Sequence, residues 1–195
     1  GCGKSYLTLL LGWCFKYLWK KPCQIVGIDR NEALIATCRE RAEQVGLEEH
    51  LRFEAQSIEA FQATLDSAHN AQKFHALISL HACDTATDDA IALGVRLGVD
   101  FLAVAPCCQV ELSRKWAALA EANVENALSP LWKIPHLRRE AAATMTDLLR
   151  TLLIRAAGYR VTPMEFVASQ HTPKNTLLRA VRETGGQAHA SQEYE

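Results

Sequence analysis

Glycine and proline are scarce in this chain, with 10 and 6 of 195 residues, which excludes collagen-like and low-complexity classes. Long apolar runs are also missing. The most hydrophobic stretch, residues 6–19, is interrupted by Lys16 and is too short to cross a bilayer. The hydrophobic fraction of 49% and the charged fraction of 22% exclude a disordered chain. We therefore expect a globular, cytoplasmic protein without a membrane partner.

Neither charge nor cysteine usage is extreme. The seven cysteines, an odd number spread over apolar segments, indicate reduced thiols and not a disulfide framework. The net charge of −1 hides an asymmetry, because residues 29–89 hold 5 basic and 12 acidic side chains whereas residues 133–182 hold 9 basic and 3 acidic ones. The basic segment favours an anionic partner, with a chance bias of helix surfaces as the alternative.

Apolar segments alternate with helical ones along the chain. The pattern predicts strands at residues 23–29, 51–56, 75–83 and 100–108, and helices at residues 4–19, 31–45, 58–68, 85–97, 113–122 and 140–157. Residues 159–169 and 175–183 are expected to form a terminal antiparallel pair, in which Pro163 indicates an edge or a bulge. This order predicts an α/β fold, doubly wound and mostly parallel, with an antiparallel last strand.

The predicted domain covers residues 1–184 and is followed by a flexible tail at residues 185–195. Glycine loops that open a helix normally follow a strand, yet no strand precedes Gly1. We expect the first strand of the sheet to be missing from this fragment and the upstream region to contribute to substrate recognition.

The opening GCGKS allows three hypotheses. It resembles the end of a phosphate-binding loop of nucleotide triphosphatases, but Tyr6 follows it, and the strand that ends in Asp29 comes too early in the chain for this acid to hold magnesium. A nicotinamide-binding loop would need a third glycine where Tyr6 stands. The spacing agrees best with S-adenosylmethionine (SAM), because Gly1 and Gly3 let the backbone approach the cofactor and Asp29 ends the next strand. There its carboxylate can accept from both ribose hydroxyls.

Gln56 and Ser57 lie at the end of the strand predicted at residues 51–56, at the level where the adenine of the cofactor would lie. The predicted cofactor site comprises Gly1, Cys2, Gly3, Asp29, Arg30, Gln56, Ser57 and His81. Two of these have structural alternatives, because Asp29 can serve as an acid at a helix N-terminus and Ser57 as a helix cap.

The blocks GCGKSYLT, IVGIDRN, LHACDTATD, APCCQ and HTPKN together resemble the methyltransferase-domain proteins of the methyltransferase-like protein 25 group and their bacterial relatives. HACDTATD and PCC also resemble blocks of a tRNA ribose 2′-O-methyltransferase family. The likeness extends from Gly1 to about Arg182. It implies a class I, Rossmann-like methyltransferase fold that binds SAM, and it leaves the acceptor open between RNA and protein.

Catalytic candidates leave the strand at residues 75–83. Because ligands of open α/β sheets bind at the carboxyl ends of the strands, His81 is the best-placed base, with Asp84 as an orienting group or alternative base. A core histidine and a helix cap are the respective alternatives. His81, Cys83, Cys107 and Cys108 are also suitable zinc ligands, but adjacent cysteines on a strand point to opposite faces, so we predict no metal.

The predicted substrate rim consists of Cys107, Cys108, His171, Lys174 and Asn175, the last three at the turn between the final strands. Asn175 can equally serve to fix that turn. The preferred partner is RNA, either tRNA or rRNA, and a protein substrate is the second choice. A non-catalytic SAM-fold module is the rival hypothesis from another class.

Overall fold

A computed structural model describes residues 1–67, 73–80, 82, 84–107, 109–167 and 175–183. The chain divides into two compact units, residues 1–71 (unit 1) and residues 72–195 (unit 2). In the described part of the chain, no helix combines the length and the apolar character that a membrane span requires.

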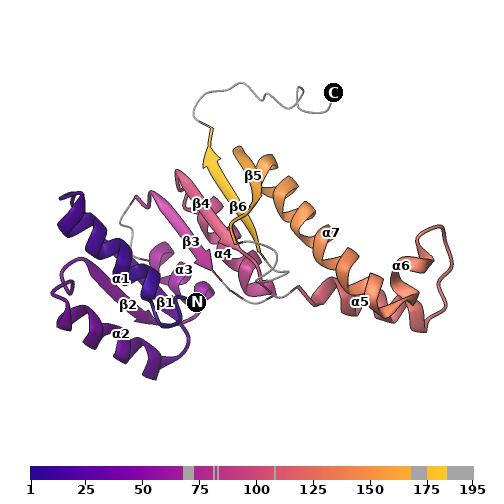
Figure 1. Cartoon of the computed structure of the whole chain (residues 1–195), viewed down its shortest axis with the longest axis horizontal. Coiled ribbons are helices and arrows are strands. Elements are labelled where there is room, and N and C mark those ends of the chain that lie inside the picture. The colour runs from indigo at the N-terminus through magenta and orange to yellow at the C-terminus, as the bar shows by residue number, and fades with distance from the viewer. Residues whose placement is uncertain (68–72, 81, 83, 108, 168–174, 184–195) are drawn as a thin grey trace. The chain divides into compact units, whose positions relative to one another are not determined.

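Unit 1 is built around two parallel strands (Figure 1). Its elements are α1 (Tyr6–Trp13), the π-helix η1 (Cys14–Leu18), β1 (Ile25–Asp29), α2 (Glu32–Gln44), β2 (Leu51–Ala55) and α3 (Ile58–Ser67). In the β1–β2 register, Ile25 lies opposite Leu51 and Asp29 opposite Ala55. Both strands therefore end at the same edge, where the Gln56 amide donates to the Asp29 carbonyl over 2.9 Å.

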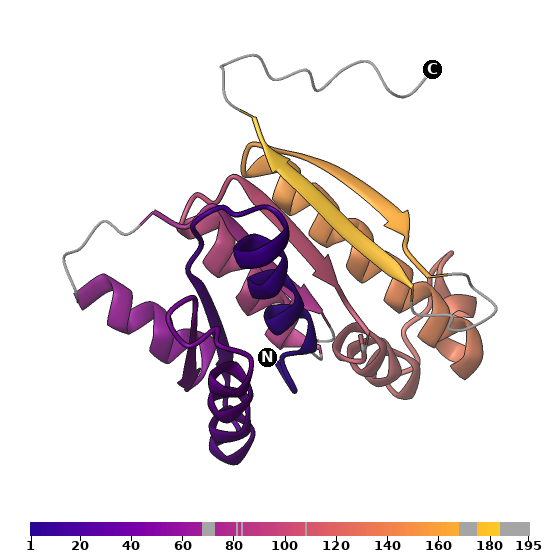
Figure 2. The ribbon, with the colours of Figure 1, turned by 60° about the vertical axis from the view of Figure 1, so that its left-hand side comes forward.

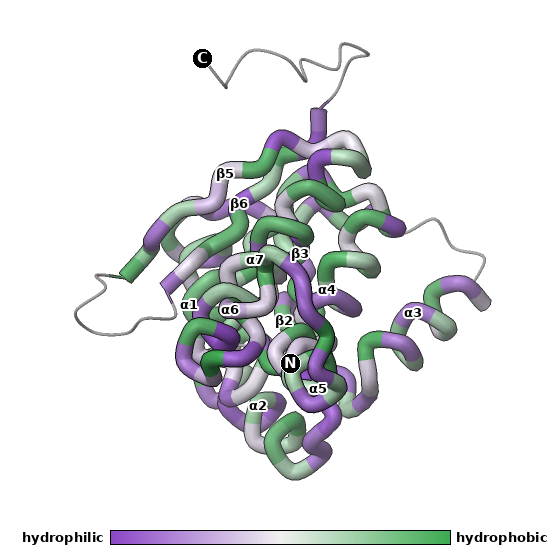
Figure 3. Tube along the Cα trace, turned by 90° about the vertical axis from the view of Figure 1, so that its right-hand side faces the viewer, coloured by the Kyte–Doolittle hydropathy of each residue, from purple (hydrophilic) through white to green (hydrophobic). Residues whose placement is uncertain are grey.

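The core of unit 1 forms where helices pack on these strands. Ile35 and Cys38 of α2 are fully buried against Leu51 and Phe53 of β2. Asn31 caps α2 by accepting from the Leu34 amide, which is why that helix begins at the predicted residue. The helix α3 alternates hydrophobic and hydrophilic residues along its trace, as an amphipathic helix does (Figure 3).

Unit 2 contains a mixed four-stranded sheet in the order β3-β4-β6-β5. Its elements are β3 (Ala76–Leu80), α4 (Thr85–Arg96), β4 (Phe101–Ala105), α5 (Glu111–Glu121), α6 (Ser129–Lys133), α7 (Pro135–Ala156), β5 (Tyr159–Glu165) and β6 (Thr176–Arg182). β3 and β4 are parallel, whereas β6 is antiparallel to both of its neighbours. The predicted α/β fold with an antiparallel last strand is confirmed, and so is the edge position of Pro163 on β5.

One face of this sheet carries the core of unit 2. Leu102 and Val104 of β4, with Leu178 of β6, pack against Ile91 of α4 and Ile154 of α7. The long helix α7 runs beside β5 and β6 (Figure 2), while its first turns pack with α5 and α6 into a helical extension.

Three local predictions were wrong. The first helix is α-helical only to Trp13 and continues as a π-helix, because residues 14–18 form bonds to the fifth residue and not the fourth. The helix expected at residue 140 begins at Pro135, whose fixed φ and missing N–H suit the first helical position. The short helix α6 was not predicted, because five residues give too little periodicity.

Replacing Tyr159 by Phe is expected to lower the free energy of unfolding by about 0.5–1.5 kcal/mol, the net contribution of one hydrogen bond. The Tyr159 side chain is buried, and its hydroxyl donates to the Val99 carbonyl over 2.9 Å. Burial raises the pKa of the Tyr159 phenol in the folded state. The contribution of the neutral phenol to the free energy of unfolding is therefore complete below the unfolded pKa of about 10, and it is lost as the pH rises through the higher folded pKa. Urea unfolding at neutral and alkaline pH measures both effects, with Tyr6→Phe on the surface as control. Equal stability of Tyr159→Phe and the wild type at pH 7 would contradict the assignment.

Candidate functional site

The glycine loop and the end of β1 are held together by Asp29. Its Oδ2 accepts from the Gly3 amide over 3.0 Å, and its Oδ1 accepts from the Asn31 amide over 3.1 Å. Gly3 has φ of +54°, a left-handed conformation that glycine adopts without strain, and the Gly1 Cα is close enough for an added Cβ to lie 3.6 Å from Oδ2. The loop and the carboxylate therefore form one cluster.

Each oxygen of the Asp29 carboxylate has two lone pairs, and the two backbone amides occupy one lone pair on each. The side chain is only partly buried. Asp29 thus has two roles. It accepts from the Asn31 amide at the start of α2, and its carboxylate can still accept from two hydroxyl groups. These free acceptor positions fit a ribose with two vicinal hydroxyls, which donate.

The same cluster disfavours a phosphate ligand. A phosphate-binding loop offers free backbone amides to an anion, whereas the Gly3 amide here donates to a carboxylate that would repel a phosphate. Ser5, whose counterpart would bind magnesium, is only 3% exposed, so its hydroxyl is not presented to an ion from solvent. The triphosphatase hypothesis therefore finds no support in this loop.

Other predicted cofactor residues lie near this edge with local partners. The Ser57 hydroxyl accepts from the Ala60 amide over 3.1 Å, so Ser57 caps α3, the alternative that its sequence position left open. Gln56 is fixed by its backbone bond to Asp29. Arg30 is exposed, and its guanidinium lies 4.0 Å from the Glu59 carboxylate. Their contacts with a cofactor stay predictions.

Two thiols lie beside the glycine loop. Cys38 Sγ donates to the Gly3 carbonyl over 3.5 Å, and Cys2 Sγ lies 3.9 Å from the same oxygen. Burial raises the pKa of Cys2, which keeps this thiol protonated at neutral pH. Cys2, Cys14, Cys23 and Cys38 are unpaired, in agreement with the prediction of reduced thiols.

Asp84 occupies a strained turn between β3 and α4. Its φ of +52° and ψ of −121° are rare for a residue with a side chain, and such backbone strain costs about 1–3 kcal/mol. The side chain does not cap α4, which corrects the alternative reading of this residue. Instead, Oδ1 accepts from the Val110 and Glu111 amides at the start of α5, each over 3.2 Å.

A buried arginine that sequence reasoning missed supports this turn. Arg150 of α7 is 4% exposed and donates to Asp88 through two bonds, Nε to Oδ1 over 2.7 Å and Nη2 to Oδ2 over 3.0 Å. Its Nη2 also donates to the Asp84 carbonyl over 3.1 Å. Asp147 lies 3.4 Å from Nη1 and accepts from the Gln109 amide. The signal in the sequence was a single arginine within the apolar run LLRTLL.

Charge pairing keeps Arg150 ionised despite its burial. Burial acts to lower the pKa of Arg150, but the hydrogen bonds and charge of Asp88, together with Asp147, outweigh it and raise the pKa. A buried guanidinium with two carboxylates forms a network that fixes geometry, because each partner is unfavourable when left alone.

The predicted substrate rim is only partly described. Cys107 follows β4 and is partly buried. Asn175 is 5% exposed and donates to the Val167 carbonyl over 2.8 Å, which fixes the start of β6 as its turn alternative predicted. The remaining candidates, His81, Cys108, His171 and Lys174, lie outside the described residues, as does the zinc candidate Cys83. Among the residues that are described, no group of three or more metal-ligating side chains occurs.

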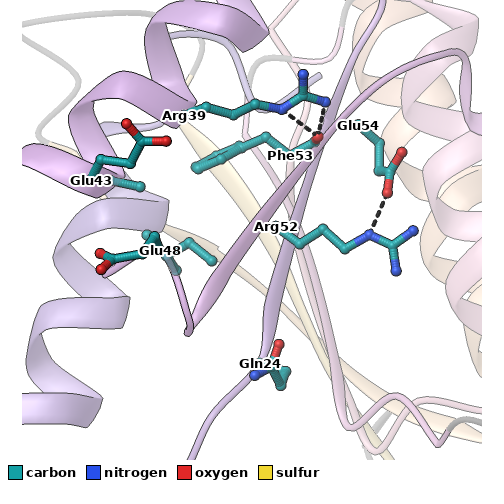
Figure 4. Close-up of a pocket in the computed structure, with 9 residues that line it drawn as sticks. Gln24, Arg39, Glu43, Glu48, Arg52, Phe53 and Glu54 are labelled. Atoms are coloured by element: carbon teal, nitrogen blue, oxygen red, sulfur yellow. Dashed lines mark hydrogen bonds and ion pairs between the residues drawn. The ribbon is translucent and has the colours of Figure 1, made fainter. Parts of the chain in front are cut away.

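Each unit has a hollow of its own. In unit 1, a cavity of about 480 Å³ lies beside the edge strand β2, where Arg39 donates to the Phe53 carbonyl and Arg52 pairs with Glu54 (Figure 4). In unit 2, a cavity of about 240 Å³ is lined by Asp84, Arg150 and leucines of α5 and α7. Neither hollow includes the glycine loop.

Comparisons with known proteins agree with this architecture. A family model described as a methyltransferase domain matches residues 1–115. No curated protein matches the sequence.

Three solved structures share the fold. An rRNA methylase from Streptococcus thermophilus is 11% identical, with a TM-score of 0.54, over 94% of this chain and 84% of that chain. A geranyl diphosphate methyltransferase in complex with SAM is 13% identical, with a TM-score of 0.54, over 94% and 76%. A methyltransferase from Podospora anserina, bound to S-adenosylhomocysteine (SAH), is 13% identical, with a TM-score of 0.53, over 94% and 70%. These likenesses establish the Rossmann-like methyltransferase fold.

Proposed function

This chain belongs to the methyltransferase-domain family, and we propose that it transfers a methyl group from SAM to RNA. The observation that carries the proposal is the Asp29 carboxylate at the end of β1, bonded to the Gly3 amide of the glycine loop with lone pairs left for two hydroxyls. Fold neighbours with bound SAM or SAH support the choice of cofactor. The resemblance to the methyltransferase-like protein 25 group is part of this proposal.

Residues of unit 1 bind the cofactor in this proposal. Asp29 accepts from the ribose hydroxyls, the Gly1–Gly3 backbone approaches the methionine part, and Gln56 and Ser57 lie at the level of the adenine. Bound SAM supplies an electrophilic methyl group on a sulfonium.

Residues of unit 2 act on the acceptor. Asp84, with His81 as the second candidate, takes the proton that an acceptor hydroxyl or amine loses as it forms its bond to the methyl carbon. The bonds to Val110 and Glu111 use Asp84 Oδ1, while the described contacts place none on Oδ2. The carboxylate is therefore anchored through one oxygen and offers the other to a proton.

RNA is the preferred acceptor for two reasons. Residues 133–182 carry 9 basic and 3 acidic side chains, and an excess of basic charge attracts a polyanion. In addition, one of the fold neighbours is an rRNA methylase. A protein acceptor is the second candidate, because aromatic residues that could stack on bases are sparse, at 7% of the chain.

The proposal is tested with methyl-tritiated SAM and two substrate pools. Unmodified tRNA and rRNA transcripts form one pool, and protein extracted from cells that lack the gene forms the other. We expect tritium in the RNA pool, with the position identified by mass spectrometry of nucleosides. Label in the protein pool alone would replace RNA by protein as acceptor. SAM binding without transfer to either pool would favour a non-catalytic module, and no SAM binding in calorimetry would refute the proposal.

A further inference from the structure

Asp84 is held in place by hydrogen bonds to both its backbone and its side chain. The Asp84 carbonyl accepts from the Thr87 amide over 3.2 Å and from Arg150 over 3.1 Å, while its carboxylate accepts from two amides of the α5 start. A strained backbone persists only when its surroundings fix it in this way. Of these partners, only Arg150 comes from a distant helix and through a side chain.

Arg150 also fixes the helix that follows the turn. The planar guanidinium of Arg150 donates to both carboxylate oxygens of Asp88 in the first turn of α4. A single side chain therefore holds the turn and the helix N-terminus in one geometry. A lysine at this position has a single ammonium group and lacks the planar pair of donors that a guanidinium offers. It could pair with Asp88 or reach the Asp84 carbonyl, but it could not reproduce this set of bonds.

We propose that Arg150 is a positioning residue for methyl transfer, which acts by holding Asp84 in its strained conformation. This inference rests on the proposed function of Asp84. The guanidinium itself touches neither cofactor nor acceptor. Its contribution is geometric, because a misplacement of about 1 Å at a reacting group can reduce a rate by about a hundredfold.

The test is the variant Arg150→Lys, compared with Arg155→Lys on the same helix. Arg155 is exposed and donates to the Val161 carbonyl over 3.3 Å, away from the turn. With methyl-tritiated SAM and the unmodified RNA transcripts, we expect Arg150→Lys to lower kcat about tenfold, to leave SAM affinity within about twofold, and to melt close to the wild type. Arg155→Lys should match the wild type in all three.

A double-mutant cycle with Asp84→Asn separates positioning from general stability. If Arg150 acts through Asp84, Arg150→Lys should change kcat less than about twofold in the Asp84→Asn background, because the group it positions is already gone. The same tenfold loss in both backgrounds would overturn the inference, as would full activity of Arg150→Lys beside an active wild type.

A readout without turnover distinguishes a failure of this inference from a failure of the proposed function. Asp84 protects the Val110 and Glu111 amides, so hydrogen exchange of these two amides should become about tenfold faster in Arg150→Lys and stay unchanged in Arg155→Lys. Unchanged protection would overturn the inference even if the wild type proves inactive. If Arg150→Lys does not fold, Asp88→Asn replaces it in both experiments, since it loosens the same guanidinium while leaving its charge in place.

Discussion

Replacing Asp84 by Asn is expected to reduce methyl transfer about a hundredfold or more while cofactor affinity stays unchanged. This is the usual contribution of a positioned acid or base. Asn keeps an oxygen that can accept from the Val110 and Glu111 amides, and it tolerates a positive φ better than most residues. The substitution therefore removes the proton acceptor and preserves the turn.

The measurement is single-turnover transfer to unmodified RNA transcripts, together with a thermal melt and SAM calorimetry on the same sample. Asp100→Asn is the matched control, because Asp100 precedes β4 at the opposite edge of the sheet and pairs with Lys73 over 3.1 Å. Wild-type turnover in a folded Asp84→Asn protein would leave Asp84 as a turn residue only. The catalytic assignment would then fall to His81 alone.

The sequence was sufficient for the elements whose signals are local. Asn31 and the apolar spacing of α2 predicted that helix, and the branched, apolar residues before Asp29 predicted the strand β1, which ends at this carboxylate. The end of a parallel strand is where a ligand binds in an open α/β sheet, so a single acid could be assigned a role without any coordinates. The outer position of Pro163 followed from its missing N–H in the same way.

The parts that failed depend on contacts between distant segments. Nothing near Asp84 indicates that its carboxylate bonds to amides 26 and 27 residues away, so the local pattern suggested a cap on α4 instead. Arg150 is separated from Asp88 by 62 residues, and only the packing of α7 beside α4 reveals their pairing. Propensity describes neighbours on the same helix, whereas a network of this kind is set by tertiary structure.

Replacing Asp29 by Ala is expected to weaken SAM binding about tenfold to a hundredfold, which corresponds to about 1.5–3 kcal/mol for a carboxylate that accepts from two ribose hydroxyls. The substitution also leaves the Gly3 and Asn31 amides without their acceptor. Part of the loss therefore comes from a looser glycine loop. Asp29→Asn separates the two contributions, because its one oxygen can still accept from a loop amide while its NH₂ group cannot accept from a hydroxyl.

Isothermal calorimetry with SAM, and with an analogue that lacks the ribose hydroxyls, measures the expected difference. Glu54→Gln on β2 is the control, since this carboxylate pairs with Arg52 on the same unit and takes no part in the glycine loop. We expect Asp29→Ala to bind both ligands about equally, whereas the wild type should prefer SAM by that part of the lost factor which the ribose hydroxyls contribute. A folded Asp29→Ala protein with wild-type affinity for SAM would show that the carboxylate only starts α2. The ribose would then have to be bound elsewhere, and the observation on which the proposed function depends would be lost.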